Sequence, residues 1–559
     1  MEITRQQFSQ KLSAVQKAIK ECDFMAIDTE LSGLHRPPTS IRLYNMKDRY
    51  QEYKEATERF IIIQFGLCTF QWDEPSGRYI AKPFNFYIFP TSITGHIQTN
   101  RIFMTQAQAF DFLTKQSFDF NKWVYQGIPY MTRAEEEAYV SAATKKLKDD
   151  MPDIPIDAKE LDFVNNARNL IQDFLTKTKE ESEGVNIVTK NAYQRRLIYQ
   201  EARKFEGITA IGMQGFIRVV KLSKEQHDSR NREKQEKFEK DCEVAVGFRK
   251  VIDMISESGK LVIGHNMLLD ICHVIAQFVE PLPETLSEFK QLAHRVFPKM
   301  IDTKHMSMSE PELITIFGSG TSLEVLRFET KKETFKNPHI DMHAEFPRYL
   351  TEMAHEAGYD AFMTGAVFLK MVGYLDEKRN PDKYTAIRSE REALEREKEK
   401  ERERRSEKKV DADGWEISED EEEQADSAWN NDEEEIYNYG SIRLDIEDKQ
   451  GKMSNVYSNI MNKAALVRTA FEYFDFTDQS PALGQVQALH VSHKPDFTFT
   501  KELADSLFLE HGKYIVEPKD DQSLYIVFEN LRKDIESLNI SHEELTIKPV
   551  INKSLDEML

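Results

Sequence analysis

The sequence has few of the residues that stabilise small secreted folds. Only four cysteines occur among 559 residues, and no two of them are spaced as CxxC. This scarcity argues against a disulfide framework and against a structural zinc site. It is typical of a protein that works in a reducing intracellular compartment.

Long apolar segments are also missing. The sequence contains no run of about 18 apolar residues, which a membrane-spanning helix needs. Residues 1–6, MEITRQ, lack the apolar stretch of a secretory signal. We therefore expect no association with a membrane.

Positive charge is in short supply, because the formal net charge is −21. Much of the excess is local: residues 411–435 include 13 acidic side chains and no basic one. Removing those 13 negative charges leaves −8 on the rest of the chain, and a mildly acidic body can still hold a basic channel. Net charge therefore neither supports nor excludes nucleic-acid binding.

The apolar content is enough for folded domains. Hydrophobic residues make up 40% of the chain and aromatic residues 11%, and the length favours two to four domains. Apolar spacing predicts an α/β arrangement. The expected strands are 23–28, 60–68, 84–89 and 261–264. The expected helices are 6–21, 107–115, one ending near 258, one from 267, and 361–374.

The second half of the chain changes character several times. Residues 388–409 carry 10 basic and 8 acidic side chains, typical of an exposed helix or a solvated linker. The acidic run that follows buries too little apolar surface to fold. Apolar periodicity returns at 456–474. Strands at 488–492, 514–517, 524–528 and 545–549, with helices at 501–510 and 531–538, then give the β-α-β-β-α-β order of a split βαβ unit.

Three short motifs place acids on apolar scaffolds. Asp28 and Glu30 end a buried strand, and residues i and i+2 of a strand point to one face. Asp270 lies one turn into an apolar helix. Asp360 begins another helix, and His355 precedes it in the turn.

Each motif has an ordinary structural explanation when taken alone. Asp28 and Glu30 fit a polar strand end, Asp270 fits a surface acid, and His355 fits a solvated loop residue. The combination of all three is much harder to explain in that way. Carboxylates that converge repel each other unless a cation lies between them, so together these residues predict a metal site.

These motifs carry a specific resemblance. DTE at 28–30, GHNMLLD at 264–270 and HEAGYD at 355–360 resemble the three exonuclease motifs of the DEDDh superfamily. The match is to its poly(A)-specific ribonuclease branch, which includes the piRNA 3′-end trimmers. It extends to QFGLCTF at 64–70, FDFNK at 118–122, GIPY at 127–130 and DTK at 302–304. It covers nearly all of the chain except about 376–450.

The resemblance implies an RNase H-like, mixed-sheet exonuclease core of the α/β class. The core would comprise residues 1–151 and 225–375, and a helix within 451–484 would complete it. A small helical module of the Arg-x₃-His RNA-binding type would be inserted at 152–224. A charged helix and disordered acidic linker at 376–450, an RRM-like domain at 485–551 and a tail at 552–559 complete the expected organisation.

The resemblance also implies the chemistry. Asp28, Glu30, Asp270 and Asp360 would hold two Mg²⁺ ions, for which Mn²⁺ can substitute, and His355 would activate water. The expected reaction is 3′→5′ hydrolysis of single-stranded RNA, with poly(A) as substrate and 5′-nucleoside monophosphates as products. Three residues would contact the 3′-terminal nucleotides: Asn266, Lys304 and Phe112. Alternatively, Lys304 is plain surface and Phe112 plain core.

Several positions depart from the family pattern. The inserted module has Tyr199 where the signature of Arg195 requires histidine. The four tryptophans are Trp72, Trp123, Trp415 and Trp429, so the RRM-like segment has none and binding of a 5′ cap is not expected. We expect Tyr525 and Phe528 in that segment to be core residues rather than a base-stacking surface.

Two alternatives remain open at this stage. Within the same chemistry, the substrate could be the 3′ ends of piRNA precursors. In another class, the chain could be a catalytically inactive RNA-binding scaffold, although the intact acidic set argues against this. The family further suggests a homodimer, and a location in the cytoplasm, with the nucleus or RNA granules as further sites.

Overall fold

The computed structural model describes most of the chain. The described residues are 1–34, 46–91, 101–147, 152–177, 184–221, 224–335, 337–385, 389, 396, 400, 443–444, 454, 456–467, 473–477, 488–512, 514–528 and 535–550. They divide into two compact units. The first contains Met1–Thr91, Thr99–Thr132 and Phe248–Leu559, and the second contains Arg133–Gly247.

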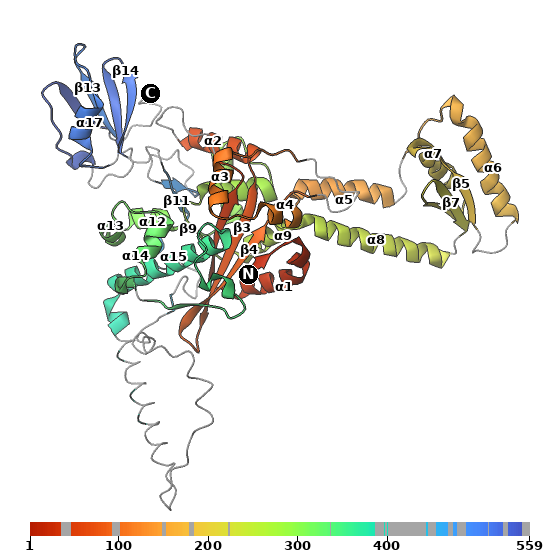
Figure 1. Cartoon of the computed structure of the whole chain (residues 1–559), viewed down its shortest axis with the longest axis horizontal. Helices are drawn as coiled ribbons and strands as arrows, with labels where there is room; N and C mark the ends of the chain where they lie inside the picture. Colours follow the sequence, from red (N-terminus) through yellow and green to blue (C-terminus); the bar gives the residue numbers. More distant parts are fainter. Residues whose placement is uncertain are drawn as a thin grey trace, which may run out of the picture. The chain divides into compact units, whose positions relative to one another are not determined.

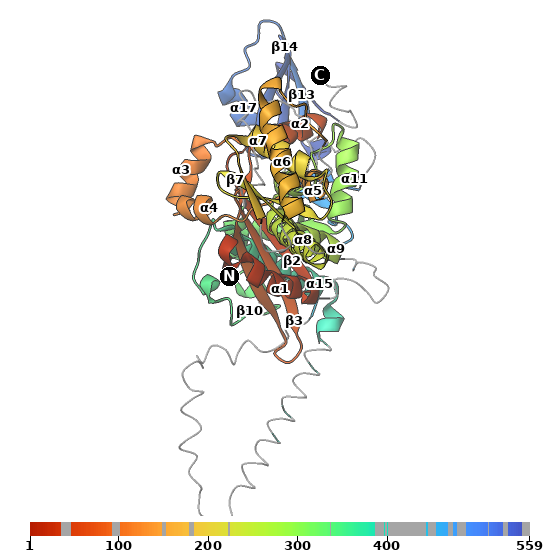
Figure 2. The ribbon, with the colours of Figure 1, turned by 90° about the vertical axis from the view of Figure 1, so that its right-hand side faces the viewer.

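A seven-stranded mixed sheet forms the centre of the first unit (Figure 1 and Figure 2). Its order is β1-β4-β3-β2-β8-β9, and β10 also pairs with β4. The strands are β1 (Glu2–Ile3), β2 (Phe24–Leu31), β3 (Ile62–Asp73), β4 (Arg78–Tyr87), β8 (Leu261–Gly264), β9 (Met300–Asp302) and β10 (Ile340–Met342). β2, β3 and β4 are antiparallel neighbours, whereas β8 runs parallel to both β2 and β9. The mixed α/β class predicted from the sequence is therefore confirmed.

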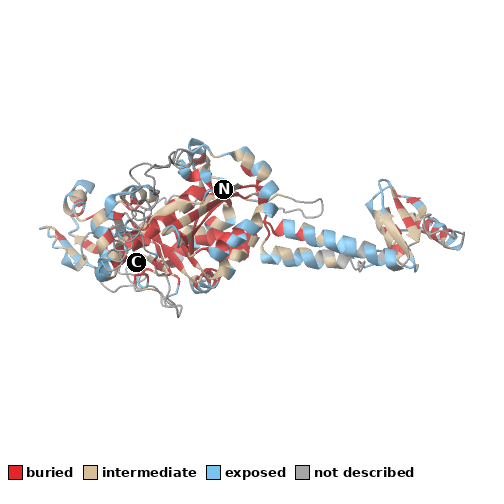
Figure 3. Ribbon diagram, turned by 90° about the horizontal axis from the view of Figure 1, so that it is seen from below, coloured by how far each residue is buried: buried red, intermediate tan, exposed pale blue. Residues whose placement is uncertain are grey.

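Helices cover both faces of this sheet. One apolar core involves α1 (Arg5–Glu21), α2 (Met46–Arg59), α9 (Arg249–Ser258), α10 (Leu268–Val274) and α11 (Leu286–Val296). The opposite core involves α12 (Thr303–Ser309), α13 (Pro311–Phe317), α14 (Leu323–Glu329) and α15 (Ala357–Arg379). Figure 3 shows the buried strands between these helices. Two further helices, α3 (Ala107–Lys115) and α4 (Phe120–Gln126), pack on a smaller aromatic cluster.

The alternation of side chains along β2 explains where the acids lie. Met25 and Ile27 enter the core with α1, whereas Phe24 and Ala26 enter the core with α15. Because successive residues of a strand face opposite sides, Asp28 and Glu30 continue the α15 face.

The second unit combines helices with a small sheet. It contains α5 (Arg133–Leu147), α6 (Leu161–Lys177), α7 (Ala192–Ala202), α8 (Lys224–Val246) and the antiparallel strands β5 (Gly184–Val188), β6 (Ile208–Gly212) and β7 (Phe216–Lys221), in the order β5-β7-β6. Our description of 152–224 as helical is therefore incomplete, because Val185, Ile187, Ile217 and Val219 alternate into its core as strand residues.

A separate four-stranded antiparallel sheet lies near the C-terminus, with the order β14-β15-β13-β16. Its elements are β13 (Ala488–His493), α17 (Lys501–Phe508), β14 (Tyr514–Asp520), β15 (Ser523–Phe528) and β16 (Leu545–Pro549). Tyr525 and Phe528 are buried, so the expectation that they are core residues is confirmed. In the predicted helix at 531–538, the described part contains a single 3₁₀ turn at Ile535–Ser537.

Two other helix predictions are wrong. The long helix expected to end near 258 breaks into α8 and α9 at Gly247, whose φ of 52° is left-handed. In the described part of 451–484 no helix is present; instead β11 (Lys463–Ala465) and β12 (Tyr473–Asp475) form an antiparallel pair. The apolar residues of that pair, such as Ala464 and Phe474, still pack into the core of the central sheet.

Two predictions fall on residues that lie wholly or almost wholly outside the described part of the chain. The acidic run at 411–435 lies outside the described residues, as does nearly all of the charged segment at 388–409. Within the described part, no helix is both long enough and apolar enough to span a membrane.

Candidate active site

Three of the predicted carboxylates meet at one point. Asp28 and Glu30 come from β2, and Asp360 comes from the first turn of α15. One carboxylate oxygen from each of the three lies within 4.8 Å of the other two. Residues separated by about 330 positions in sequence therefore share one small volume.

A missing side chain on β3 allows α15 to approach. Gly66 pairs with Asp28 in the sheet, and a Cβ atom placed on Gly66 would lie 1.8 Å from the carbonyl oxygen of Ala357. The neighbouring Gln64 is buried, and its Oε1 accepts a hydrogen bond of 2.9 Å from the Ala357 amide. These contacts fix the start of α15 directly against β3, which carries Asp360 toward Asp28.

Asp270 lies beside this group rather than within it. The 4.8 Å group does not include its carboxylate, whose Oδ1 accepts a hydrogen bond from the Thr29 hydroxyl. Thr29 alternates with Asp28 and Glu30 along β2, so it links Asp270 to the strand that carries the other two acids. The negative charge of Asp270 nevertheless acts on both Asp28 and Glu30.

His355 occupies the turn before α15 in a left-handed conformation, with a φ of 64°. Its amide donates a 3.2 Å hydrogen bond to Asp360 Oδ1, which couples the histidine backbone to the carboxylate group. Its Nε2 lies 3.9 Å from Glu324 Oε1 of α14. Its ring meets the edge of the Phe112 ring at a centroid distance of 4.9 Å.

Burial disfavours the ionised state of all four acids, and repulsion within the group adds to this effect at Asp28 and Glu30. Burial raises the pKa of Asp28 well above its ordinary value, and the charges of Asp360, Asp270 and Glu30 raise it further. Burial, and after it the charges of Asp360 and Asp270, likewise raise the pKa of Glu30. Burial also raises the pKa values of Asp270 and Asp360 to about 7. Hydrogen bonds from Thr29 and from the His355 amide oppose these two shifts.

This donor set fits a hard divalent cation. The carboxylates supply oxygen ligands, which Mg²⁺ and Mn²⁺ prefer, and a cation would remove the repulsion that raises their pKa values. Without positive charge at this point, the cluster would carry an electrostatic cost that a simple structural role does not explain.

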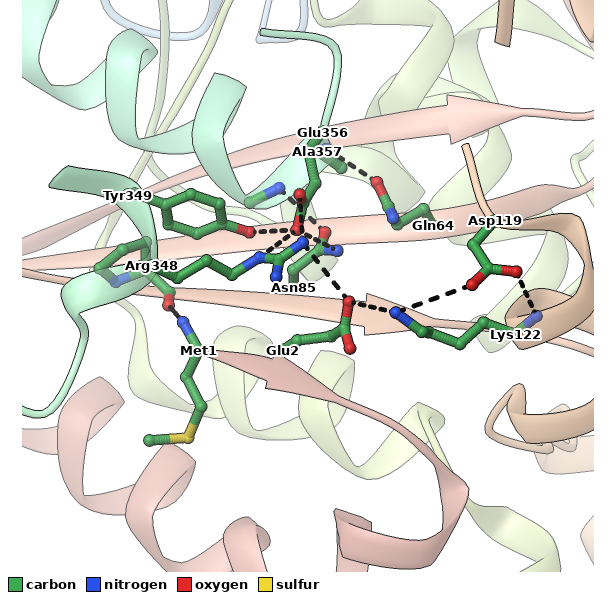
Figure 4. Close-up of polar contacts among 12 residues, drawn as sticks. Met1, Glu2, Gln64, Asn85, Asp119, Lys122, Arg348, Tyr349, Glu356 and Ala357 are labelled. Carbon is green, nitrogen blue, oxygen red and sulfur yellow. Dashed lines mark hydrogen bonds and ion pairs between the residues drawn. The ribbon is translucent and has the colours of Figure 1, made fainter. Parts of the chain in front are cut away.

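A polar network behind the site holds the turn between His355 and Asp360 (Figure 4). Glu356 accepts two hydrogen bonds from Arg348, at 3.0 and 2.7 Å, and one of 2.6 Å from the Tyr349 hydroxyl. Asn85 donates to Glu356 at 2.9 Å and accepts from the Gly358 amide at 3.0 Å. Sequence reasoning missed this network, because its members are far apart in the chain and Glu356 was noted only as part of a motif.

Asp302 holds the turn before α10 in place, as Glu356 does for the turn before Asp360. Its fully buried carboxylate accepts hydrogen bonds from five backbone amides. The donors are Asn266, Met267, Lys304, His305 and Ala465. Asp302 therefore ties the turn that precedes α10, and thus Asp270, to the start of α12.

The three predicted RNA contacts lie in different surroundings. Asn266 is exposed and has a φ of 59°, and Lys304 is half-buried near His265. The amides of both residues donate to Asp302, so the turn before α10 and the start of α12 are neighbours. Phe112 is 42% exposed and packs on His355, so the alternative that it is plain core is wrong.

The chain is similar to several known proteins. Residues 3–368 match the family described as CAF1 family ribonuclease. The chain is 37% identical over 422 residues to poly(A)-specific ribonuclease PARN of Xenopus laevis, and the match covers 70% of this chain and 65% of that relative. It is 27% identical over 381 residues to the pre-piRNA 3′-exonuclease trimmer of Bombyx mori, which covers 66% of this chain and 71% of the trimmer.

A solved structure gives a weaker match. The S. pombe Pop2p structure with Mg²⁺ and Mn²⁺ bound aligns with a TM-score of 0.33 and 14% identity, covering 68% of this chain and 93% of Pop2p. The chain spans just under two thirds of the Xenopus relative's length.

Proposed function

This chain belongs to the CAF1 family of ribonucleases, and from that premise we propose that it is a divalent-cation-dependent 3′→5′ exoribonuclease. Its substrate would be the 3′ tail of single-stranded RNA, with poly(A) as the main sequence and 5′-nucleoside monophosphates as products. The observation that carries the proposal is the meeting of Asp28, Glu30 and Asp360 within 4.8 Å, with Asp270 next to them.

The residues divide the work as follows. Asp28, Glu30, Asp270 and Asp360 would hold two cations, Mg²⁺ with Mn²⁺ as a substitute. When bound, such a pair stabilises negative charge on the attacking and leaving oxygens at phosphorus and makes water more acidic. An imidazole nitrogen of His355 would accept the proton from the attacking water, because the turn that carries it is tied to Asp360.

The RNA 3′ end would lie between the two sides of the site. Phe112 presents an exposed ring beside His355, which suits stacking on a terminal base. Lys304, in the first turn of α12, and Asn266, in the turn before α10, would contact a phosphate and a sugar or base.

The finer domain assignments belong to this proposal. We assign an RNase H-like core to the first unit, an Arg-x₃-His-type module to 152–224 and an RRM-like domain to 485–551. The antiparallel order β14-β15-β13-β16 supports the last of these. Arg195 donates a 2.9 Å hydrogen bond to the Met213 carbonyl, so this cation already serves the fold of its own module.

A second candidate substrate is the 3′ end of piRNA precursors. The absence of tryptophan from 485–551 and the burial of Tyr525 and Phe528 favour it, because neither feature suits recognition of a 5′ cap. The likeness to the Bombyx mori trimmer supports the same reading. Homodimerisation and a location in the cytoplasm, the nucleus or RNA granules are further parts of the proposal.

Hydrolysis of 5′-labelled RNA with Mg²⁺ and with EDTA tests the function. We expect shortening from the 3′ end with Mg²⁺ and none with EDTA, whereas an inactive scaffold would bind RNA in both buffers and cut it in neither. Comparing an oligoadenylate with an RNA of mixed 3′ sequence separates the two substrate classes.

Substitution of Asp28 tests the site itself. Asp28→Ala should abolish hydrolysis while the protein stays folded, because the substitution removes a cation ligand and also a carboxylate that Asp360, Asp270 and Glu30 repel. The melting temperature checks folding. Normal turnover by this variant would remove Asp28 from the metal site.

A further inference from the structure

One face of α14 leads away from the active site. Glu324, Arg327, Phe328 and Lys331 are spaced i, i+3, i+4 and i+7, so they lie along one side of the helix and of the turn that continues it. We call these four residues the α14 stripe. The stripe begins at the active site, because Glu324 Oε1 lies 3.9 Å from His355 Nε2.

The centre of the stripe is an exposed aromatic ring. Phe328 is 66% exposed, more than Phe112 at the site itself. Lys332 Nζ lies 5.6 Å from the centroid of its ring. Phe328 follows Glu324 by one helical turn, an axial distance of about 6 Å. An exposed aromatic ring beside a cation, one turn from the glutamate that faces His355, is suited to stacking on a nucleobase.

Arg327, the residue before Phe328, supplies further positive charge. It is half-buried, and its Nε is buried without a hydrogen-bond partner in the described part of the chain. Its guanidinium carbon lies 5.9 Å from the centroid of Phe362. The other two cations already have carboxylate partners: Lys331 pairs with Glu352 at 2.9 Å, and Lys332 pairs with Glu329 at 2.6 Å.

A second cation lies near Arg327. Burial, followed by the charge of Arg327, lowers the pKa of Lys370 on α15 to about 8. Burial also lowers the pKa of Arg327, which the charges of Tyr359 and Glu352 partly offset. The two cations therefore repel each other, which adds to the positive potential around Arg327.

We propose that the α14 stripe is a subsite for single-stranded RNA upstream of the 3′-terminal nucleotide. A base would stack on Phe328, and a neighbouring phosphate would accept hydrogen bonds from Arg327. The proposal rests on the exoribonuclease function given above. RNA is favoured over a protein partner because an exposed aromatic ring is combined with cations, which is typical of sequence-tolerant strand binding. The stripe is also continuous with the site that holds the 3′ end.

The stripe is tested by substrate length. For Phe328→Ala we expect the KM for an oligoadenylate of about 10 nucleotides to rise about five- to tenfold, equivalent to about 1–1.4 kcal/mol. The KM for a dinucleotide, which is too short to reach Phe328, should stay unchanged, as should kcat for both substrates. Phe328→Trp should restore or strengthen binding of the longer RNA, because every base can stack on an indole.

A matched control separates the stripe from a general surface effect. Tyr125 on α4 is also aromatic and is 71% exposed, so Tyr125→Ala removes a ring of similar exposure elsewhere. This control should leave both KM values at the wild-type level. Arg327→Gln should weaken binding of the longer RNA and make it less dependent on salt, because one phosphate contact is lost.

A direct binding measurement distinguishes failure of the α14 stripe from failure of the exoribonuclease function. Anisotropy of the labelled oligoadenylate in EDTA measures its Kd without hydrolysis. A wild-type protein that binds RNA through Phe328 but never cuts it would refute the exoribonuclease function and keep the stripe. A wild-type protein that cuts RNA, with Phe328→Ala unchanged in KM and Kd for the longer substrate, would overturn the stripe alone. That second result would point to a protein partner for this face.

Discussion

Gly66 should be a position where a single methyl group inactivates the enzyme. A Cβ atom at Gly66 would lie 1.8 Å from the Ala357 oxygen, 2.1 Å from its carbonyl carbon and 2.6 Å from the Gly358 nitrogen. All three are backbone atoms, so no side-chain rotation can relieve the overlap. Reaching even 3.0 Å requires the start of α15 to move by about 1.2 Å away from β3.

That movement would carry Asp360 away from Asp28. Asp360 lies three residues after Ala357 on the same helix, whereas Asp28 pairs with Gly66 itself. A displacement of about 1 Å in a catalytic arrangement can lower the rate about 100-fold. We therefore expect Gly66→Ala to reduce kcat by about that factor, with a loss of stability of about 1–3 kcal/mol from overpacking.

The matched control is Gly77→Ala. Gly77 has a φ of 63° and open space around it, so alanine there should cost about 1 kcal/mol through backbone strain without moving the site. Both variants are assayed for hydrolysis of oligoadenylate with Mg²⁺ at a temperature where thermal melts show them folded. If Gly66→Ala retained the kcat of Gly77→Ala, the close approach of α15 to β3 would not be what assembles the site.

Two further predictions concern the charges at the site. The folded protein holds the pKa of Asp270 and Asp360 at about 7, above the ordinary 3.8, so it binds more protons than the unfolded chain between about pH 4 and pH 7. The cation-free protein should therefore lose stability as pH rises through that window, and Mg²⁺ should raise the melting temperature more at about pH 8 than at about pH 5; equal increments would contradict this. Glu356→Gln should cost about 1.5–3 kcal/mol and raise the Mg²⁺ concentration for half-maximal activity about tenfold, because it weakens the bonds from Arg348 that hold the turn before Asp360. Glu280→Gln, which removes a carboxylate from an exposed pair, is its control and should leave that Mg²⁺ concentration unchanged.

Local sequence pattern was sufficient for those helices and strands whose own residues show a clear apolar pattern. The apolar spacing of residues 6–21 and 107–115 predicted α1 and α3 closely, and the β-branched and aromatic runs predicted β2, β3 and β8. Local pattern failed in the described part of 456–474, where residues expected to be helical form β11 and the start of β12. Apolar residues in a short segment satisfy a helix or a strand equally well, and packing against the central sheet decided between them.

The chemistry was also visible before the fold. The predicted site residues were recognised from residue type and spacing. They are Asp28 and Glu30 at a strand end, Asp270, and the pair His355 and Asp360. For the first two, positions i and i+2 of a strand must share a face. The sequence alone therefore predicted a set of site residues, of which the fold brings Asp28, Glu30 and Asp360 into one group.

Tertiary structure decided how those side chains meet. No spacing rule indicates that Gly66 leaves room for Ala357, that Asn85 and Arg348 converge on Glu356, or that Phe328 is exposed one turn from the residue beside His355. Each of these depends on contacts between segments that are distant in the chain. Their geometry is set by how helices pack on the sheet, and a local sequence pattern carries no information about that packing.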